Sequence, residues 1–222
     1  MKRIFTISLI ALIFSATNVH AQSKIGIRAG LSSYSWKGDA VSTLTDLAEF
    51  TNGYVTHTGR TGFFAGAYAD LPLSEMISVQ PGIYYSQKGF TLKGDLQMDK
   101  LDFLGASARA QMQSHYIDIP VLLTANLGEG FKLFAGPQLS YLAASNLNVR
   151  AGALGFNVLN RNMDLTEQFN RYDFSLVGGA GFQFANGVSI NASYDHGLSR
   201  LDKNKNLNSY NRGFKVGIGF QF

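Results

Sequence analysis

The chain has 222 residues, among them 24 glycines, 17 phenylalanines and 10 tyrosines but only 4 prolines, and its mean hydropathy is 0.00. This composition excludes a disordered chain and a bundle of membrane helices, and it favours many strands joined by tight turns. The absence of cysteine excludes disulfides, thiolate metal sites and thiol nucleophiles, and a net charge of +4 does not indicate a nucleic-acid partner.

Residues 1–21 have the pattern of a secretory signal peptide. Lys2 and Arg3 form a charged start, a mainly apolar run follows, and small residues precede a cleavage point after Ala21. The alternative is an N-terminal anchor helix, for which the apolar run is short. We therefore predict export and cleavage, with residues 22–222 as one domain. The loss of Lys2 and Arg3 would lower the net charge from +4 to +2.

Apolar residues alternate with polar or small ones through most of the remaining chain. No run of 18 apolar residues follows Ala21, so no membrane helix is predicted there. Alternation with a period of two is typical of strands that have one apolar face. Eight segments show this pattern: 24–34, 61–71, 76–90, 116–125, 132–141, 173–182, 188–195 and 214–222. Their lengths suit strands that cross a membrane at a tilt.

The predicted connections are short and long in strict alternation. Three are short, at 72–75, 128–130 and 185–187, and four are long, at about 35–60, 88–114, 145–171 and 197–211. Short periplasmic turns and long extracellular loops are characteristic of outer-membrane barrels. The sequence therefore predicts an all-β fold, an eight-stranded antiparallel up-and-down transmembrane β-barrel with both chain ends on the periplasmic side.

The stretch YIDIPVLLT at 116–124 places Asp118 and Pro120 inside an apolar strand. In a narrow barrel the isoleucines would face lipid, while Asp118 would face a polar interior within reach of cations from other strands. The predicted interior charge cluster consists of Arg28, Asp118, Asp173, Asp195 and Lys215. Because proline cannot donate to a strand ladder, we expect β-bulges or local gaps at Pro81, Pro120 and Pro137.

Many glycines share the polar face of the predicted strands, where they would make room for tyrosine, phenylalanine and charged side chains or, as the alternative, mark bends and bulges. An eight-stranded barrel is only wide enough to be filled by side chains, so we predict a packed interior and no open pore. Aromatic and apolar residues near the strand ends predict two girdles. The outer set is Tyr85, Tyr141, Phe174, Tyr194 and Phe214, and the inner set is Leu71, Phe182, Phe220 and Phe222.

Several segments resemble the PorT-like family of outer-membrane β-barrels from Gram-negative bacteria. They are SVQPGIYYSQKG (78–89), YIDIPVLL (116–123), LFAGPQLSYL (133–142), YDFSLVGGAGFQF (172–184), INASYDHGLSRL (190–201) and the ending FKVGIGFQF. The resemblance implies an eight-stranded barrel inserted into the outer membrane by the barrel assembly machinery. The terminal Phe222, with Phe220 and Phe214 in register, resembles the C-terminal signal which that machinery reads. Some relatives take part in protein secretion, and most have no assigned role.

No catalytic, cofactor-binding or metal-ligating set is predicted. None of the histidines has a second histidine at metal-ligand spacing. A Ser-His-Asp site at Ser199, His196 and Asp195 is disfavoured because alternation sends neighbouring side chains to opposite faces. The glycines at 178–181 start no helix and so make no phosphate loop.

The sequence thus predicts a small, closed, non-enzymatic barrel of the cell outer membrane with a structural or binding role for its extracellular loops. The expected partners are outer-membrane lipid, the assembly machinery and an extracellular or envelope protein, with no cofactor and no nucleic acid. Three alternatives are an accessory of envelope secretion or assembly, an enzyme acting on membrane lipid, and a soluble lipocalin-like carrier whose apolar face points inward.

Overall fold

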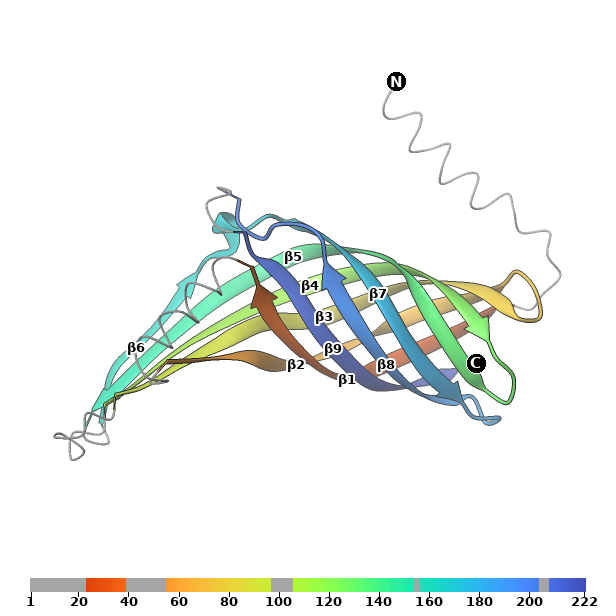
Figure 1. Ribbon diagram of the computed structural model, residues 1–222, viewed down its shortest axis with the longest axis horizontal. Helices are drawn as coiled ribbons and strands as arrows, with labels where there is room; N and C mark the ends of the chain where they lie inside the picture. The colour runs from red at the N-terminus through yellow and green to blue at the C-terminus, as the bar shows by residue number, and fades with distance from the viewer. Residues whose placement is uncertain (1–22, 39–54, 97–105, 154–155, 204–207) are drawn as a thin grey trace, which may run out of the picture.

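The structure is a computed structural model that describes residues 23–38, 55–96, 106–153, 156–203 and 208–222 (Figure 1). The predicted signal peptide, residues 1–21, lies outside these ranges. The described elements are β1 (Lys24–Lys37), β2 (Val55–Pro72), β3 (Ile77–Leu96), β4 (Ala106–Asn126), β5 (Phe131–Ala153), β6 (Phe156–Asp164), the short 3-10 helix η2 (Thr166–Gln168), β7 (Tyr172–Gln183), β8 (Val188–Gly197) and β9 (Tyr210–Gln221). No described helix is long and apolar enough to cross a bilayer.

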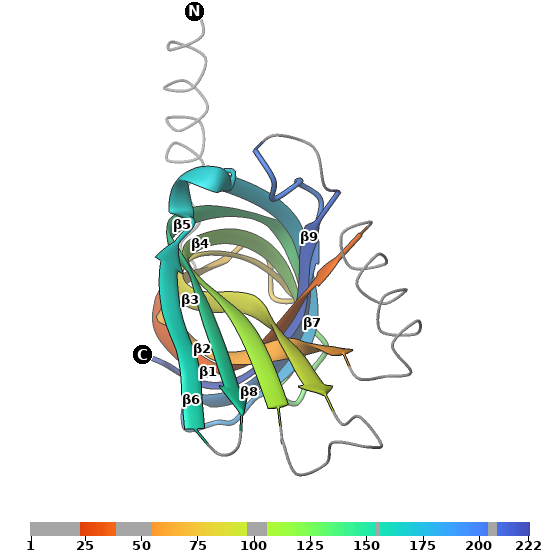
Figure 2. The same ribbon diagram turned by 90° about the vertical axis from the view of Figure 1, so that its left-hand side faces the viewer.

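Eight strands close into a ring, which Figure 2 shows from its outer end. β1 pairs with β2 on one side and with β9 on the other, and β4 pairs with β5. The order β1-β2-β3-β4-β5-β7-β8-β9 therefore returns to its start, and all neighbours are antiparallel. The predicted eight-stranded antiparallel barrel is confirmed. β6 lies outside the ring and, among the described strands, pairs with β5 alone.

The two faces of the ring differ in the way the alternation predicts. The outward side chains of Ile25, Leu31 and Ile218 are 62–67% exposed, whereas Asp118 and Ser140 on the inward face are completely buried. A barrel in water would show the opposite arrangement, because exposed apolar surface is costly there. The apolar outward face and the polar inward face fit a barrel that is surrounded by the hydrocarbon core of a membrane.

The short connections are confirmed, and all lie at one end of the barrel, here called the inner end. They join β2 to β3, β4 to β5, and β7 to β8. In the turn before β5, Gly128, Glu129 and Gly130 all have positive φ (82°, 42° and 91°). Two glycines in three positions make this left-handed path accessible. The last strand also ends here, since the Phe222 amide donates to the Ile25 carbonyl at 2.8 Å.

Two of the four long connections that were predicted as loops consist largely of β-strand. Most of 88–114 and the first part of 145–171 are strand, so those two predicted loops are largely wrong. β5 has 23 residues, about twice the ~9–11 that cross a bilayer. The outer parts of β2, β3, β4 and β5, together with β6, continue the ring on one side as a five-stranded sheet, which extends to the lower left in Figure 1. We call this sheet, from residues 55–59, 88–96, 106–115, 144–153 and 156–164, the outer wall.

The three strand prolines are accommodated by gaps in the ladders, as expected. Between β3 and β4 the pairing skips from Pro81–Val121 to Tyr84–Asp118 without a change of register, which leaves Pro120 inside the gap. The β4–β5 ladder likewise skips the position of Pro137, and the β2–β3 ladder skips that of Pro81. A gap beside proline removes fewer hydrogen bonds than a gap elsewhere, because proline has no N–H to donate.

Candidate functional site

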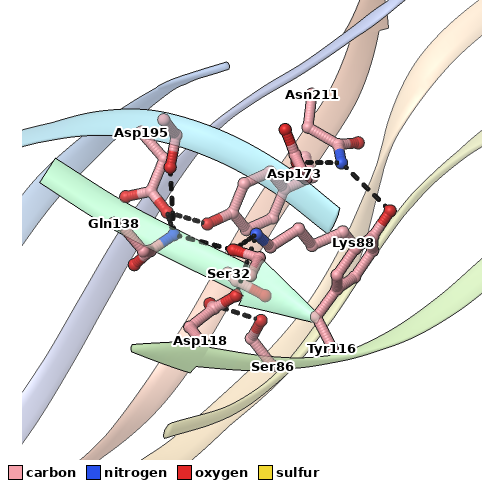
Figure 3. A network of polar contacts seen from close by, with 12 residues as sticks. Ser32, Ser86, Lys88, Tyr116, Asp118, Gln138, Asp173, Asp195 and Asn211 are labelled. Carbon is pink, nitrogen blue, oxygen red and sulfur yellow. Dashed lines mark hydrogen bonds and ion pairs between the residues drawn. The ribbon is translucent and has the colours of Figure 1, made fainter. Parts of the chain in front are cut away.

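A network of charged side chains occupies the barrel interior in its outer half, with Asp118 at its centre (Figure 3). The Asp118 carboxylate lies 3.0 Å from Lys88 Nζ and 3.2 Å from Lys215 Nζ. Ser86 Oγ donates to the same carboxylate at 2.6 Å, and Lys88 Nζ also donates to Ser140 Oγ at 3.0 Å. A carboxylate taken out of water needs such partners, since burying an unpaired charge costs several kcal/mol.

Lys215 joins this centre to a second carboxylate. Its Nζ lies 2.8 Å from Asp195 Oδ2, so one ammonium bridges Asp118 and Asp195. The same Asp195 oxygen accepts from the Tyr34 hydroxyl and, at 3.3 Å, from Gln138 Nε2. Because β8, β9 and β1 are neighbours at the ring closure, residues far apart in the sequence meet here.

Asp173 lies beside the network and is held differently. Asn211 Nδ2 donates to its carboxylate at 2.9 Å and to the Tyr116 hydroxyl at 3.4 Å (Figure 3). Asp173 is 1% exposed, and none of the ion pairs found among the described residues includes it. The network thus places three aspartates, Asp118, Asp173 and Asp195, near two lysines, Lys88 and Lys215.

Aromatic rings replace water around the two ammonium groups. Lys88 Nζ lies 4.6 Å from the centroid of the Tyr116 ring and 5.3 Å from that of Tyr34. Lys215 Nζ lies 5.8 Å from the rings of Tyr34 and Phe64. Cations near the faces of desolvated rings gain up to about 2 kcal/mol, so the rings offset part of the cost of burial.

The structure brings together most of the residues that the sequence suggested. Asp118, Asp195 and Lys215 are directly linked, and Asp173 lies next to them. Arg28 does not join them. The register aligns Ser32 with Lys215 but Arg28 with Gly219, so Arg28 lies four residues nearer the inner end.

Arg28 contacts aromatic rings instead. Its guanidinium carbon lies 4.8 Å from the Tyr68 ring and 5.6 Å from the Phe134 ring. Sequence reasoning missed Lys88, which it placed where the predicted strand 76–90 overlaps the connection 88–114, and Asn211, which it placed at the end of the connection 197–211. Lys88 continues the inward alternation of Tyr84 and Ser86 by one more step, and that signal was available in the sequence.

An apolar layer separates the network from the inner end. It consists of two groups of buried side chains, Phe64, Tyr68 and Tyr84 on one side and Leu122, Phe134 and Val177 on the other. The space that remains between this layer and Lys215 is about 30 Å³, enough for one water molecule. A larger hollow of about 730 Å³ opens at the inner end, between Lys24, Asp70 and Lys132, below this layer.

The outer end is covered by a small apolar roof. Trp36 packs against Phe90 and Phe169 with ring centroids 4.5 and 5.3 Å apart, and Leu142 and Leu201 are buried beneath. The segment from η2 to residue 171 reaches this roof through backbone hydrogen bonds to β5 and to residues 201–203. Asp164 steadies its start by accepting from the Thr166 hydroxyl and amide, which lowers the pKa of Asp164 below its ordinary value.

The sealed interior predicts that the barrel does not conduct small solutes. Liposomes containing the refolded protein should swell in iso-osmotic sugar at the rate of protein-free liposomes, because apolar and charged layers fill the bore. An open 16-stranded porin at the same protein-to-lipid ratio is the positive control. Swelling above the protein-free rate, in proportion to the amount of protein, would show that the bore is open.

The residues examined for a Ser-His-Asp site point in different directions. The Asp195 carboxylate belongs to the interior network, whereas the His196 ring lies against the Tyr194 ring with centroids 6.1 Å apart. Ser199 Oγ accepts from the Phe174 amide instead of approaching His196. Among the described residues, no group of three His, Asp or Glu side chains is placed to hold a metal ion.

Two aromatic girdles border the outward apolar face. At the outer border Phe63 contacts Tyr85, Tyr141 contacts Tyr172, and Tyr194 contacts Phe214, with ring centroids 4.8–5.6 Å apart. At the inner border Phe182 contacts Phe184 and Phe220 contacts Phe222. An apolar band between two girdles, around a polar and packed interior, defines a membrane-spanning β-barrel. The soluble carrier alternative required the apolar face to point inward and is wrong.

The family comparison gives the same class. The model described as "Outer membrane protein beta-barrel domain" matches residues 18–203, so the chain belongs to this family and is a protein of the outer membrane. No curated protein matches the chain.

Solved outer-membrane barrels resemble the chain at low identity. The attachment invasion locus protein (Ail) of Yersinia pestis is 17% identical, with 91% of this chain and 100% of that chain covered and a TM-score of 0.43. Neisserial surface protein A is 10% identical, with the same coverage and a TM-score of 0.49. OprG of Pseudomonas aeruginosa is 12% identical, with 91% and 97% covered and a TM-score of 0.31. Similarity of this degree says nothing about what the chain binds.

Proposed function

We propose that this outer-membrane barrel is a non-enzymatic binding protein that presents its outer wall to an extracellular or envelope protein. The observation that carries the proposal is the length of the wall, which continues well beyond the aromatic girdle although the barrel itself is sealed. A barrel that served only as a membrane anchor would need no such sheet. Paired strands also hold a surface in a defined shape at a lower entropic cost than loops.

The concave face of the wall, which continues the barrel interior, is largely apolar. The register aligns Phe90 with Met112 and Leu147, and the next inward-facing row aligns Leu92, Ala110 and Val149. Phe90 and Met112 are buried, while Leu92, Ala110, Leu147 and Val149 remain partly exposed. A partly exposed apolar face on a rigid sheet suits a protein partner, since buried apolar area is the main source of affinity.

A photo-crosslinking residue at Val149 should give a discrete protein adduct on intact cells. The same residue at Ile119, on the lipid-facing band of the barrel, is the matched control and should give none. Leu147→Glu should abolish the Val149 adduct while the barrel still migrates as a folded, heat-modifiable band. The proposal fails if Val149 and Ile119 give the same adducts, or if no position on the concave face gives one.

The alternative is an accessory role in envelope secretion or assembly. It is favoured by the motifs shared with the PorT-like group, such as YIDIPVLL at 116–123, some members of which take part in secretion. In that case the barrel would co-purify stoichiometrically with other envelope proteins. The terminal Phe222, which with Phe214 and Phe220 lies on the outward face, would serve insertion by the assembly machinery in either case. Replacing Phe222 with alanine tests that role.

A further inference from the structure

Three cations form a row across the outer wall. The register aligns Lys93 of β3 with Arg109 of β4, and Arg109 with Arg150 of β5. All three are exposed, and none takes part in an ion pair found among the described residues. Like charges directly opposite on neighbouring strands destabilise a sheet. A row of three that lacks an ion-pair partner among the described residues therefore favours the binding of an anion.

The three side chains lie on the outward face of the wall, above the bilayer that surrounds the barrel. Residues two apart on a strand share a face, so Arg109 lies on the same side of β4 as His115 and the lipid-facing Ile117 and Ile119. The intervening residue Met112 belongs to the opposite, inward face and is buried. Along this side of β4 the apolar Ile119 and Ile117 are followed by His115, whose ring lies against the girdle residue Tyr85. Gln113 and Gln111 come next, and Arg109 is last. This order follows the polarity of a bilayer from hydrocarbon to charged headgroups.

An uncharged polar row lies between the girdle and the cations on the same face. The register aligns Gln111, Asn148 and Asn162 across β4 to β6, and these three are partly or fully exposed, whereas Thr91, which aligns with Gln111 on β3, is buried. Amide side chains both donate and accept hydrogen bonds, as sugar hydroxyls do. Closer to the girdle, Arg60 lies within electrostatic reach of Tyr85 and His115. Its buried Nε and Nη1 have no hydrogen-bond partner among the described residues.

The height of the row fits the saccharide layer of the outer leaflet. Arg109 lies six residues beyond His115, which at about 3.3 Å per residue is roughly 20 Å along the strand. Because barrel strands tilt by about 35–45°, this corresponds to a height of roughly 15 Å above the girdle. In an outer membrane this zone is filled by lipopolysaccharide, whose inner sugars carry phosphates. We propose that the convex face of the outer wall binds the phosphorylated sugars of neighbouring lipopolysaccharide. Lys93, Arg109 and Arg150 pair with the phosphates, and the uncharged row binds the sugar hydroxyls. This site lies on the face opposite the proposed protein-binding surface.

The test compares two triple variants of the full barrel, refolded in non-ionic detergent. One removes the row (Lys93→Gln, Arg109→Gln, Arg150→Gln). The matched control removes three exposed cations that lie outside the outer wall (Lys37→Gln, Arg200→Gln, Lys203→Gln). Binding is titrated with purified deep-rough lipopolysaccharide, with its dephosphorylated form, and with heparin. Heat-modifiable migration verifies that each variant is folded.

The row variant should bind lipopolysaccharide roughly a hundredfold more weakly at low salt, because each cation near an anionic lipid surface contributes about fivefold. The control should stay near wild type, and dephosphorylation should reduce wild-type binding toward that of the row variant. Equal losses in both variants, or no effect of dephosphorylation, would overturn the proposal. Stronger binding of heparin than of lipopolysaccharide through the same row would assign it to a soluble polyanion instead. If the row variant does not fold, the comparison of phosphorylated with dephosphorylated lipopolysaccharide on the wild-type protein still tests the proposal.

Discussion

Replacing Asp118 with alanine is expected to cost the folded barrel about 3–5 kcal/mol, one of the two largest effects that the structure predicts. The change leaves the Lys88 and Lys215 ammonium groups buried on either side of an empty position. They repel each other there, and only Lys215 retains a carboxylate partner, Asp195. The free energy of unfolding, measured by urea titration in lipid vesicles or detergent, checks this expectation.

A paired variant distinguishes loss of charge balance from loss of packing. Lys88→Met combined with Asp118→Leu removes one charge of each sign and leaves Lys215 paired with Asp195. It should be more stable than Asp118→Ala alone, because replacing both members of a buried pair is often neutral. The interpretation of the network as an electrostatic unit is wrong if the paired variant is the less stable of the two, or if Asp118→Ala costs less than 1 kcal/mol.

A lipid-facing residue of the same strand carries the second large effect. Val121→Arg should destabilise the inserted barrel by about 2–4 kcal/mol, because a cation is most costly at the middle of the lipid-facing band. Val121 is exposed and lies about midway between Ile117, which aligns with the outer girdle, and Asn126 at the inner end of β4. The free energy of unfolding, measured for the protein inserted in lipid bilayers, checks this value. Gln113→Arg, on the same side of β4 but beyond the girdle, is the matched control and should change stability by no more than about 0.5 kcal/mol. Similar costs at the two positions would contradict the assigned depth of the band.

The sequence predicted the barrel well because lipid and interior impose opposite demands on alternate residues. Ile117 and Ile119 could only face hydrocarbon if Asp118 faced inward, and the same rule placed Asp195 and Lys215 inside. The alternation does not determine the register between strands, so it could not predict the height of each charged side chain along the barrel axis. Arg28 therefore seemed a member of the network, although its register places it beside Tyr68 and Phe134.

The outer wall was missed for a related physical reason. Beyond the girdle, water is available to both faces of a strand, so selection for apolar residues on one face weakens. Segments such as 106–114 then carry alanine, serine and glutamine, which sequence reasoning assigns to loops. The backbone pairing continues all the same, because neighbouring strands already run side by side when they leave the membrane. Because of this error the sequence analysis left Lys88, at the start of the wall in β3, out of the interior network.

The seam between β1 and β9 sets the order in which this molecule can form. Gly26 pairs with Gln221 and Lys37 with Tyr210, so the ring joins residues from the two ends of the chain. Every other pair of neighbouring strands in the ring is closer in sequence. Pairing those strands closes a shorter loop and therefore costs less chain entropy. The last contacts are the least local, which gives the fold a high contact order and makes slow, all-or-none closure its natural kinetics.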